Sequence, residues 1–243
     1  MSDRPDPPDH LEPPSPPERV TGPPARGRVL VLAPHPDDET IGPGGTVLLH
    51  ADAGDEVHAL FLTAGAAGDP TGAEDPAAYA VVRQEEARAA ASVLGIGSLD
   101  FWGLPDHHRV HENDLSLLVP KMQKALASVA PDVVYAPHAA DQHSDHHATA
   151  VILQRALAEC GATPAVFGYE VWSAGPARWV VDVSASYDRK LEALRCYPSQ
   201  LAFTDIERFI TGLNSYRAVF LEKDARYGEA FSPLEADASA GRS

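Results

Sequence analysis

The most reactive group of side chains in the sequence follows an apolar run near the amino terminus. Residues 29–45 read VLVLAPHPDDETIGPGG and place four such side chains within five positions: His35, Asp37, Asp38 and Glu39. An imidazole and a carboxylate three residues apart on a turn can supply two ligands to a divalent ion such as zinc. Asp37 faces the other way, so it would be free to take a proton from an attacking water.

A second polar cluster, APHAADQHSDHHAT at 136–149, follows another apolar run. A catalytic zinc needs three protein ligands and an open position, so a histidine from residues 143–147 could complete the set. The alternative is an acidic turn that caps a helix, with Asp37 or Asp38 as the N-cap residue. The histidine that precedes the acidic pair and the second histidine-rich loop together favour the metal site.

Alternating strands and helices position both clusters. The pattern predicts strands at 28–34, 55–63, 99–105 and 131–138, separated by helices at 44–54, 77–96 and 115–130, with a further helix at 145–161. This order indicates βαβ units and a mostly parallel sheet with helices on both faces, a Rossmann-like α/β fold. Ligands bind such sheets beyond the carboxyl ends of the strands, where both clusters stand. Two more strands at 163–172 and 177–184 and a helix at 185–200 form a small C-terminal extension.

Composition restricts the class of protein. The 243 residues carry a formal charge of −16, which argues against non-specific nucleic-acid binding. No apolar run is long enough for a membrane span and no secretory signal is seen, so a cytoplasmic location is expected. Two cysteines, Cys160 and Cys196, are too few for a disulfide framework. Residues 1–28 hold nine of the 22 prolines and are predicted to be a disordered tail before a single catalytic domain at 29–243.

At this point the motifs are similar to those of a known family. PHPDDE at 34–39, followed by GPGGT, and HSDH at 143–146 resemble the two signatures of the PIG-L/LmbE-like zinc-dependent de-N-acetylases. The resemblance extends from about residue 28 to the end of the chain. It implies a metal-dependent hydrolase that removes the N-acetyl group from an amino-sugar-containing compound and releases acetate. A GlcNAc-type glycoconjugate or a natural-product intermediate is the substrate class expected.

The resemblance also implies roles for individual residues. His35, Asp38 and His146 match the family's ligands and would bind one zinc ion per chain, a site type that also accepts iron or manganese. Asp37 matches the general base. His143 matches the histidine that stabilises the tetrahedral intermediate and protonates the departing amine.

Three further positions carry weaker implications. Asp145 would orient an imidazole, as carboxylates behind metal-binding histidines do. Arg83 and Asp106 match positions that hold sugar hydroxyls in relatives that act on N-acetylglucosaminyl compounds, although Arg83 could equally pair with a neighbouring helix glutamate. The chain departs from many relatives at Ala66 and Ala67, where an acidic residue is common.

The other histidines have simpler interpretations. His147 is the alternative third ligand, His138 is expected to orient the loop, and Glu39 is expected near the helix N-terminus. His107 and His111 lie in a turn-like segment and would line the mouth of the pocket, while the role of His108 is open.

Two other classes of protein remain in view. A nucleotide-binding Rossmann protein is disfavoured because ETIGPGG is not G-x-G-x-x-G and the aspartates would repel a pyrophosphate. A non-catalytic sugar- or metal-binding module on the same fold would not need the general base Asp37 or the acid His143. The sequence leaves the number of subunits open, and a homo-oligomer is compatible with it.

Overall fold

An eight-stranded sheet forms the centre of the computed structural model, which describes residues 15–72, 74–107 and 112–234. The strand order is β1-β7-β8-β6-β5-β2-β3-β4. β8 runs antiparallel to β6 and β7, and the other neighbouring pairs are parallel. The strands are β1 Glu18–Val20, β2 Val29–Ala33, β3 Val57–Thr63, β4 Ser98–Leu104, β5 Val133–Pro137, β6 Ala165–Tyr169, β7 Trp179–Asp182 and β8 Gly228–Pro233.

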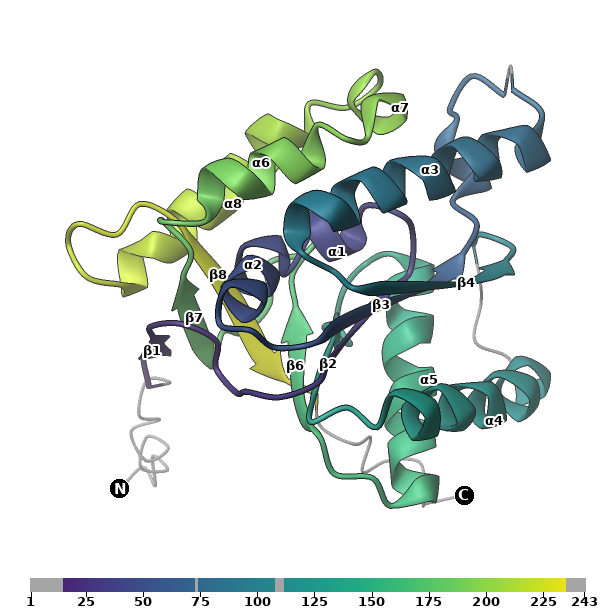
Figure 1. The fold of residues 1–243 in the computed structure, drawn as a ribbon, viewed down its shortest axis with the longest axis horizontal. Coiled ribbons are helices and arrows are strands. Elements are labelled where there is room, and N and C mark those ends of the chain that lie inside the picture. The colour runs from purple at the N-terminus through teal and green to yellow at the C-terminus, as the bar shows by residue number, and fades with distance from the viewer. Residues whose placement is uncertain (1–14, 73, 108–111, 235–243) are drawn as a thin grey trace, which may run out of the picture.

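Helices cover both faces of this sheet (Figure 1). α4 and α5 pack against one face, whereas α1, α2, α3, α6 and α8 cover the other. The helices are α1 Asp38–Ile41, α2 Gly44–Asp52, α3 Pro76–Leu94, α4 Glu112–Val129, α5 Ser144–Cys160, α6 Tyr187–Leu194, α7 Pro198–Leu201 and α8 Ile206–Arg217, with 3-10 turns η1 Ala66–Gly68 and η2 Ala218–Phe220.

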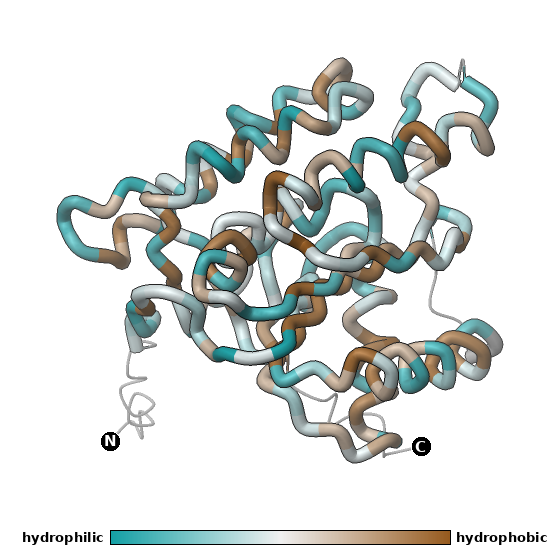
Figure 2. The backbone as a smooth tube through the Cα atoms, in the orientation of Figure 1, coloured by the Kyte–Doolittle hydropathy of each residue, from teal (hydrophilic) through white to brown (hydrophobic). Residues whose placement is uncertain are grey.

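The central strands are apolar on both sides because both faces are covered. In β2, Val29 and Val31 pack with the helices of the larger layer, while Leu30 and Leu32 pack with α4 and α5. Figure 2 shows the resulting hydrophobic colouring along the middle strands. The predicted α/β fold with a mostly parallel sheet is therefore confirmed, and the C-terminal strands extend the same sheet.

The strand order reverses between β2 and β5. From β2 the chain builds outward through β3 to β4, and it then returns to β5 and builds outward through β6. Such a reversal opens a crevice at the carboxyl ends of the two central strands, where ligands of open α/β sheets bind. The two polar clusters follow β2 and β5, so the topology brings both to this crevice.

The structure corrects the prediction at both ends of the domain. The expected disordered tail of 1–28 is too long, because β1 pairs with β7 and the Glu18 amide donates to the carbonyl of Arg178 at 2.9 Å. Backbone pairing holds this edge strand although its sequence is polar, and residues 1–14 lie outside the described residues. Near the other end, α8 and β8 were not expected, and the helix expected at 185–200 divides before Pro198, which begins α7.

Within the described part of the chain, none of the helices combines the length and the apolar character needed to cross a bilayer.

Candidate active site

The turn after β2 folds tightly around the carboxylate of Asp38. The amide of His35 donates to Asp38 Oδ2 at 2.9 Å, and Nδ1 of the same histidine lies 3.0 Å from that oxygen. The glycines that follow are needed for close packing: a Cβ at Gly42 would overlap the ring of Tyr169, and one at Gly45 would lie 2.7 Å from Cβ of Val183. The glycines therefore let α1 and α2 sit directly on the sheet behind the polar turn.

His146, in the first turn of α5, completes the cluster from the other strand. Its Nε2 lies 3.2 Å from Asp38 Oδ2, so this one oxygen contacts ring nitrogens from both His35 and His146. The ring is fully buried, yet among the described residues neither of its nitrogens has a hydrogen bond of good geometry. Buried nitrogens are rarely left in this way unless another partner binds them. The donor set of two imidazoles and a carboxylate therefore fits a divalent metal ion.

A fourth side chain, His143, stands within the same group. One ligand atom from each of His35, His143 and His146 lies within 4.8 Å of the others. The ring centroid of His143 is 4.7 Å from that of His35 and 4.9 Å from that of His146. Burial and the two neighbouring imidazoles lower the pKa of His143, which favours its neutral form.

The charges in this cluster stabilise one another despite burial. Burial opposes ionisation of His35, but Asp145 and Asp38 raise its pKa to about 10. Burial likewise opposes ionisation of His146, but Asp38 and Asp141 raise its pKa to about 9. Although burial disfavours the carboxylate of Asp38, the same two imidazoles hold its pKa well below the usual range. A metal ion needs neutral imidazoles, so its binding would release these protons.

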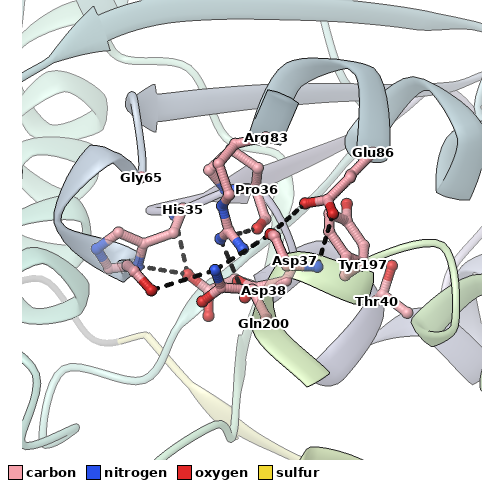
Figure 3. Close-up of polar contacts among 12 residues, drawn as sticks. His35, Pro36, Asp37, Asp38, Thr40, Gly65, Arg83, Glu86, Tyr197 and Gln200 are labelled. Carbon is pink, nitrogen blue, oxygen red and sulfur yellow. Dashed lines mark hydrogen bonds and ion pairs between the residues drawn. The ribbon is translucent and has the colours of Figure 1, made fainter. Parts of the chain in front are cut away.

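Asp37 lies next to the ligand cluster and is bound by Arg83 (Figure 3). Nη2 of Arg83 donates to Asp37 Oδ2 at 3.1 Å and also to the carbonyl of Pro36. The backbone of Asp37 has φ 138°, an uncommon conformation for a non-glycine residue that costs about 1–3 kcal/mol. Burial raises the pKa of Asp37 to about 6, against the opposing effect of Arg83. A carboxyl group that titrates near neutrality beside a metal site is suited to proton transfer.

His35, Asp37, Asp38 and His143 open into one cavity of about 180 Å³, and His146 is buried behind them. Its lining comes from the turn after β2, from η1, α3, α7 and the start of α5, and from the loops that follow β4 and β6. The lining residues include His35, Asp37, Asp38, Gly65, Arg83, Asp106, His107, His143, Trp172 and Gln200.

Most of these residues lie in the part of the chain that matches a known family. Residues 30–157 match the PIG-L family, described as GlcNAc-PI de-N-acetylase. The chain belongs to the PIG-L family. It is 31% identical over 196 residues to the probable N-acetyl-alpha-D-glucosaminyl L-malate deacetylase 2 of Bacillus anthracis, covering 74% of this chain and 85% of that protein.

Two further relatives show the range of the PIG-L family. The solved structure of N,N'-diacetylchitobiose deacetylase from Pyrococcus horikoshii superimposes with a TM-score of 0.73 at 25% identity, covering 85% of this chain and 84% of that one. The 4-oxalmesaconate hydratase of Pseudomonas putida is 26% identical over 193 residues, covering 70% of this chain and 73% of that protein. The relatives of this chain thus include deacetylases and a hydratase.

The structure brings together the residues that the PIG-L signatures singled out. The three predicted ligands and the predicted base lie side by side, and His143 stands next to them. Asp145 contacts Nε2 of His35 at 2.9 Å and the amide of His107 at 2.8 Å, so the imidazole it meets most closely is that of His35. The catalytic and ligand roles of these residues stay predictions.

Arg83 and Asp106, the two predicted sugar-binding residues, both line the cavity but make different contacts. Asp106 uses both carboxylate oxygens to fix the turn after β3, accepting from the amides of Gly65 at 2.9 Å and Ala67 at 2.7 Å. Arg83 is almost fully buried, and its Nε and Nη1 have no hydrogen-bond partner among the described residues. The sequence left open a pairing of Arg83 with a neighbouring helix glutamate. In the structure Arg83 forms its ion pair with Asp37.

Sequence reasoning missed Asp141. Its Oδ1 lies 3.5 Å from Nδ1 of His146 and accepts from the amide of His143 at 2.9 Å, while Oδ2 accepts from the amide of Trp172 at 3.0 Å. The residue therefore orients His146 and ties it to the loop after β6. Its position inside the histidine-rich cluster was the available signal.

The remaining candidates lie outside the ligand group. His147 is exposed, and its Nδ1 is 2.9 Å from the carbonyl of Ala139. His138 contacts the carbonyl of Ser173 at 2.8 Å and so holds a loop, as expected. Glu39 is buried behind the turn and accepts from the amide of Asp37 at 3.1 Å. His108 and His111 lie outside the described residues.

Proposed function

We propose that this protein is a metal-dependent de-N-acetylase that hydrolyses the acetamido group of an amino-sugar-containing compound and releases acetate. The observation that supports this most is the meeting of His35, Asp38 and the buried His146 next to a cavity that His35, Asp37 and Asp38 line. Two relatives carry deacetylase names that include N-acetylated sugars, which points to the same substrate class for this chain.

The metal site has a defined place in this proposal. His35, Asp38 and His146 would hold one divalent ion, zinc by analogy with the family, which when bound polarises a carbonyl and lowers the pKa of water. The chemistry of two imidazoles and one carboxylate also suits iron or manganese.

The chain's own residues would carry the proton transfers. Asp37 takes a proton from the attacking water, and its raised pKa lets it hold that proton during the reaction. The new C–O bond forms at the acetyl carbon, where His143 faces the developing oxyanion. The C–N bond then breaks as the amine nitrogen receives, through His143, the proton that Asp37 took from the water, and acetate is left behind.

Substrate selection would come from the rim of the cavity. Arg83 lines the cavity and keeps two buried nitrogens, Nε and Nη1, without a hydrogen-bond partner among the described residues, and Asp106 fixes the turn that carries Ala66 and Ala67. A small N-acetyl amino sugar would meet Arg83 and Asp106 through its hydroxyls, and the two alanines add no carboxylate of their own to that side of the cavity.

A test must separate hydrolysis from hydration and from mere binding, because the family includes a hydratase. The purified protein would be analysed for metal and then assayed for acetate release from N-acetylglucosamine, its methyl glycoside and N,N'-diacetylchitobiose. A parallel assay would follow water addition to an unsaturated dicarboxylic acid. Acetate release that disappears after chelation and returns with zinc supports the proposal.

Other outcomes would overturn it. Hydration of the unsaturated acid without acetate release would assign this chain to the hydratase branch. A metal-loaded protein that binds the sugars without turning over any of them would indicate a binding module.

A further inference from the structure

An exposed tryptophan stands at the rim of the candidate active site. Trp172 lines the cavity together with His143 and Gln200, and 45% of its surface is exposed. Its amide donates to Asp141 Oδ2 at 3.0 Å, which ties its backbone to the carboxylate beside His146. Its indole stacks on Phe209 of α8, with ring centroids 5.6 Å apart and planes 20° from parallel.

The loop that carries this tryptophan is fastened by a buried ion pair. Nε of Arg217 donates to Glu170 Oε2 at 3.0 Å, and Nη2 donates to the carbonyl of Gly175 at 2.7 Å. The amide of Gly175 in turn donates to Glu170 Oε1 at 2.6 Å. The segment on both sides of Trp172 is thus held before any ligand arrives. A ligand that stacks there would lose little free energy in ordering the loop.

The apolar surface continues beyond the cavity along α8. Phe209 also lines an open groove of about 530 Å³, together with Asp205, Arg208, Gly212, Leu213 and Tyr216. A Cβ at Gly212 would meet nothing within 4 Å, so the groove is not filled at this point, and 57% of Tyr216 is exposed. Trp172 and Phe209 therefore connect the polar cavity to an aromatic groove.

This continuity limits what the groove can bind. A ligand that enters the polar cavity with its acetamido group would carry its other end over Trp172 and onto α8. The surface it meets there is aromatic and aliphatic, and its two charged residues, Asp205 and Arg208, have opposite signs. Such a surface selects for apolar area instead of net charge. Exposed aromatic rings held rigidly at a rim are typical anchors for a ligand.

We infer that Trp172 and the groove on α8 form a subsite for an apolar alkyl or aryl aglycone, so that the favoured substrate is an amphiphilic N-acetyl amino-sugar glycoside. The inference rests on the proposed function for the sugar end of that substrate. It assigns Trp172 and Phe209 a role in specificity that the metal chemistry does not require.

The test compares methyl and hexyl glycosides of N-acetylglucosamine as substrates, with the hexyl compound kept below its micelle-forming concentration. For the unmodified protein we expect kcat/KM to be about tenfold or more higher for the hexyl glycoside, mostly through KM, as for alkyl groups that enter an apolar site. In Trp172→Ala the hexyl-to-methyl ratio should fall toward one, and Trp172→Phe should restore part of it. Tyr216→Ala, at a more exposed position, provides a second variant.

Leu117→Ala is the matched control, because Leu117 is an exposed apolar residue on α4, on the opposite face of the sheet. It should leave the ratio unchanged. Equal efficiency on both glycosides in the unmodified protein, or a ratio that Trp172→Ala and Tyr216→Ala leave intact, would refute the subsite.

A binding measurement keeps the two proposals apart. Hexyl glucoside lacks the acetamido group, so calorimetric titration with it reports on the groove without deacetylation. Binding that Trp172→Ala weakens about tenfold, in a protein that releases no acetate from any glycoside, would leave the subsite standing while the proposed function fails. Absence of such binding would refute the subsite. Dimerisation in sedimentation that Trp172→Ala abolishes would instead identify the groove as a contact between copies.

Discussion

Two buried ionic clusters lie on the two sides of the α1–α2 turn, and they differ in how well their polar atoms are satisfied. Behind the turn, Nζ of Lys190 contacts Glu229 Oε1 at 2.6 Å, the carbonyl of Gly42 at 3.1 Å and Asn214 Oδ1 at 3.1 Å. Glu229 also accepts from the amide of Thr46 at 2.8 Å and from its hydroxyl at 2.7 Å. In front of the turn, the buried side-chain atoms of the described residues that lack a hydrogen bond of good geometry all belong to Arg83 and His146.

From this contrast we infer that one cluster serves folding and that the other binds a ligand. A buried polar group without a partner costs about 1–3 kcal/mol, so folding alone favours clusters like that of Lys190 and Glu229. For the cluster at Asp38 and His146, whose imidazole nitrogens lack a hydrogen bond of good geometry among the described residues, we infer an arrangement that suits a metal ion.

Two fully buried histidines differ in the same way, in whether their ring nitrogens have hydrogen bonds. His50 has Nδ1 2.8 Å from Asp55 and Nε2 2.9 Å from the hydroxyl of Tyr135, so both nitrogens are used. His146 has neither nitrogen in a hydrogen bond of good geometry among the described residues. The first histidine is therefore expected to be structural and the second to be a ligand.

The substitution with the largest expected effect distinguishes the roles of these two histidines. His146→Ala should remove both the metal and measurable acetate release, because it deletes a ligand. His50→Ala should keep the metal stoichiometry but lower the free energy of unfolding by about 1–3 kcal/mol for each partner left unpaired. Metal analysis by mass spectrometry and urea denaturation measure the two effects. Full metal occupancy in His146→Ala would make His143 the third ligand, since it belongs to the same group of ligand atoms.

The next effect tests whether Asp37 belongs to the chemistry or only to the fold. Asp37→Asn should retain the metal and lower kcat by about two to four decades, the usual scale for removing a general base. Single-substrate kinetics on the metal-loaded variant, with circular dichroism as a check on folding, would measure this. Near-normal turnover would indicate that the neighbouring buried carboxyl of Glu39 is the base instead.

A third substitution tests the cluster of Lys190 and Glu229 behind the α1–α2 turn. Lys190→Met should lower the free energy of unfolding by about 3–5 kcal/mol, because it leaves the Glu229 carboxylate buried without its cation. The double variant with Glu229→Gln should be less destabilised than the sum of the two single variants, since the uncompensated charge is gone. Urea denaturation of all four proteins gives the coupling. Strict additivity would mean that the pair does not act as a unit.

The smallest expected effect is a pH dependence of stability from His50. Burial lowers the pKa of this imidazole below its usual 6.5. Between 6.5 and its folded pKa, the unfolded chain binds a proton there and the folded protein does not, so the free energy of unfolding decreases as the pH falls through this window. One such group contributes at most about 1.4 kcal/mol per pH unit. Metal-free His50→Gln should show a shallower pH dependence than the metal-free unmodified protein, and identical slopes would contradict the assignment.

Much of the site could be predicted because its parts are local in sequence. His35, Asp37 and Asp38 occupy one turn, and their relative geometry follows from three residues of backbone. The alternation of strands and helices also predicted that both clusters would share one sheet edge. The Lys190–Glu229 cluster could not be predicted in this way, because its members come from α6 and β8, far apart in the chain.

Four further predictions from the sequence await experiment. The zinc identity, the sugar contacts of Arg83 and Asp106, the cytoplasmic location and a homo-oligomer are expectations for experiment. The structure adds that Arg83 is bonded to Asp37 and that both oxygens of Asp106 are engaged by backbone amides. Substitution of either residue would therefore disturb the shape of the cavity as well as any contact with a sugar.

The sequence by itself determined the fold class, the family and the chemical types gathered at the sheet edge, because these follow from periodicity and from residues close together in the chain. Only the tertiary structure shows that His146 lies beside Asp38 and that His147 is exposed, although the two are adjacent on α5 and point about 100° apart. It alone placed Asp141 between His146 and Trp172 and laid that indole on Phe209. These contacts depend on which helix face meets the sheet and on how distant loops pack, and no local pattern specifies either.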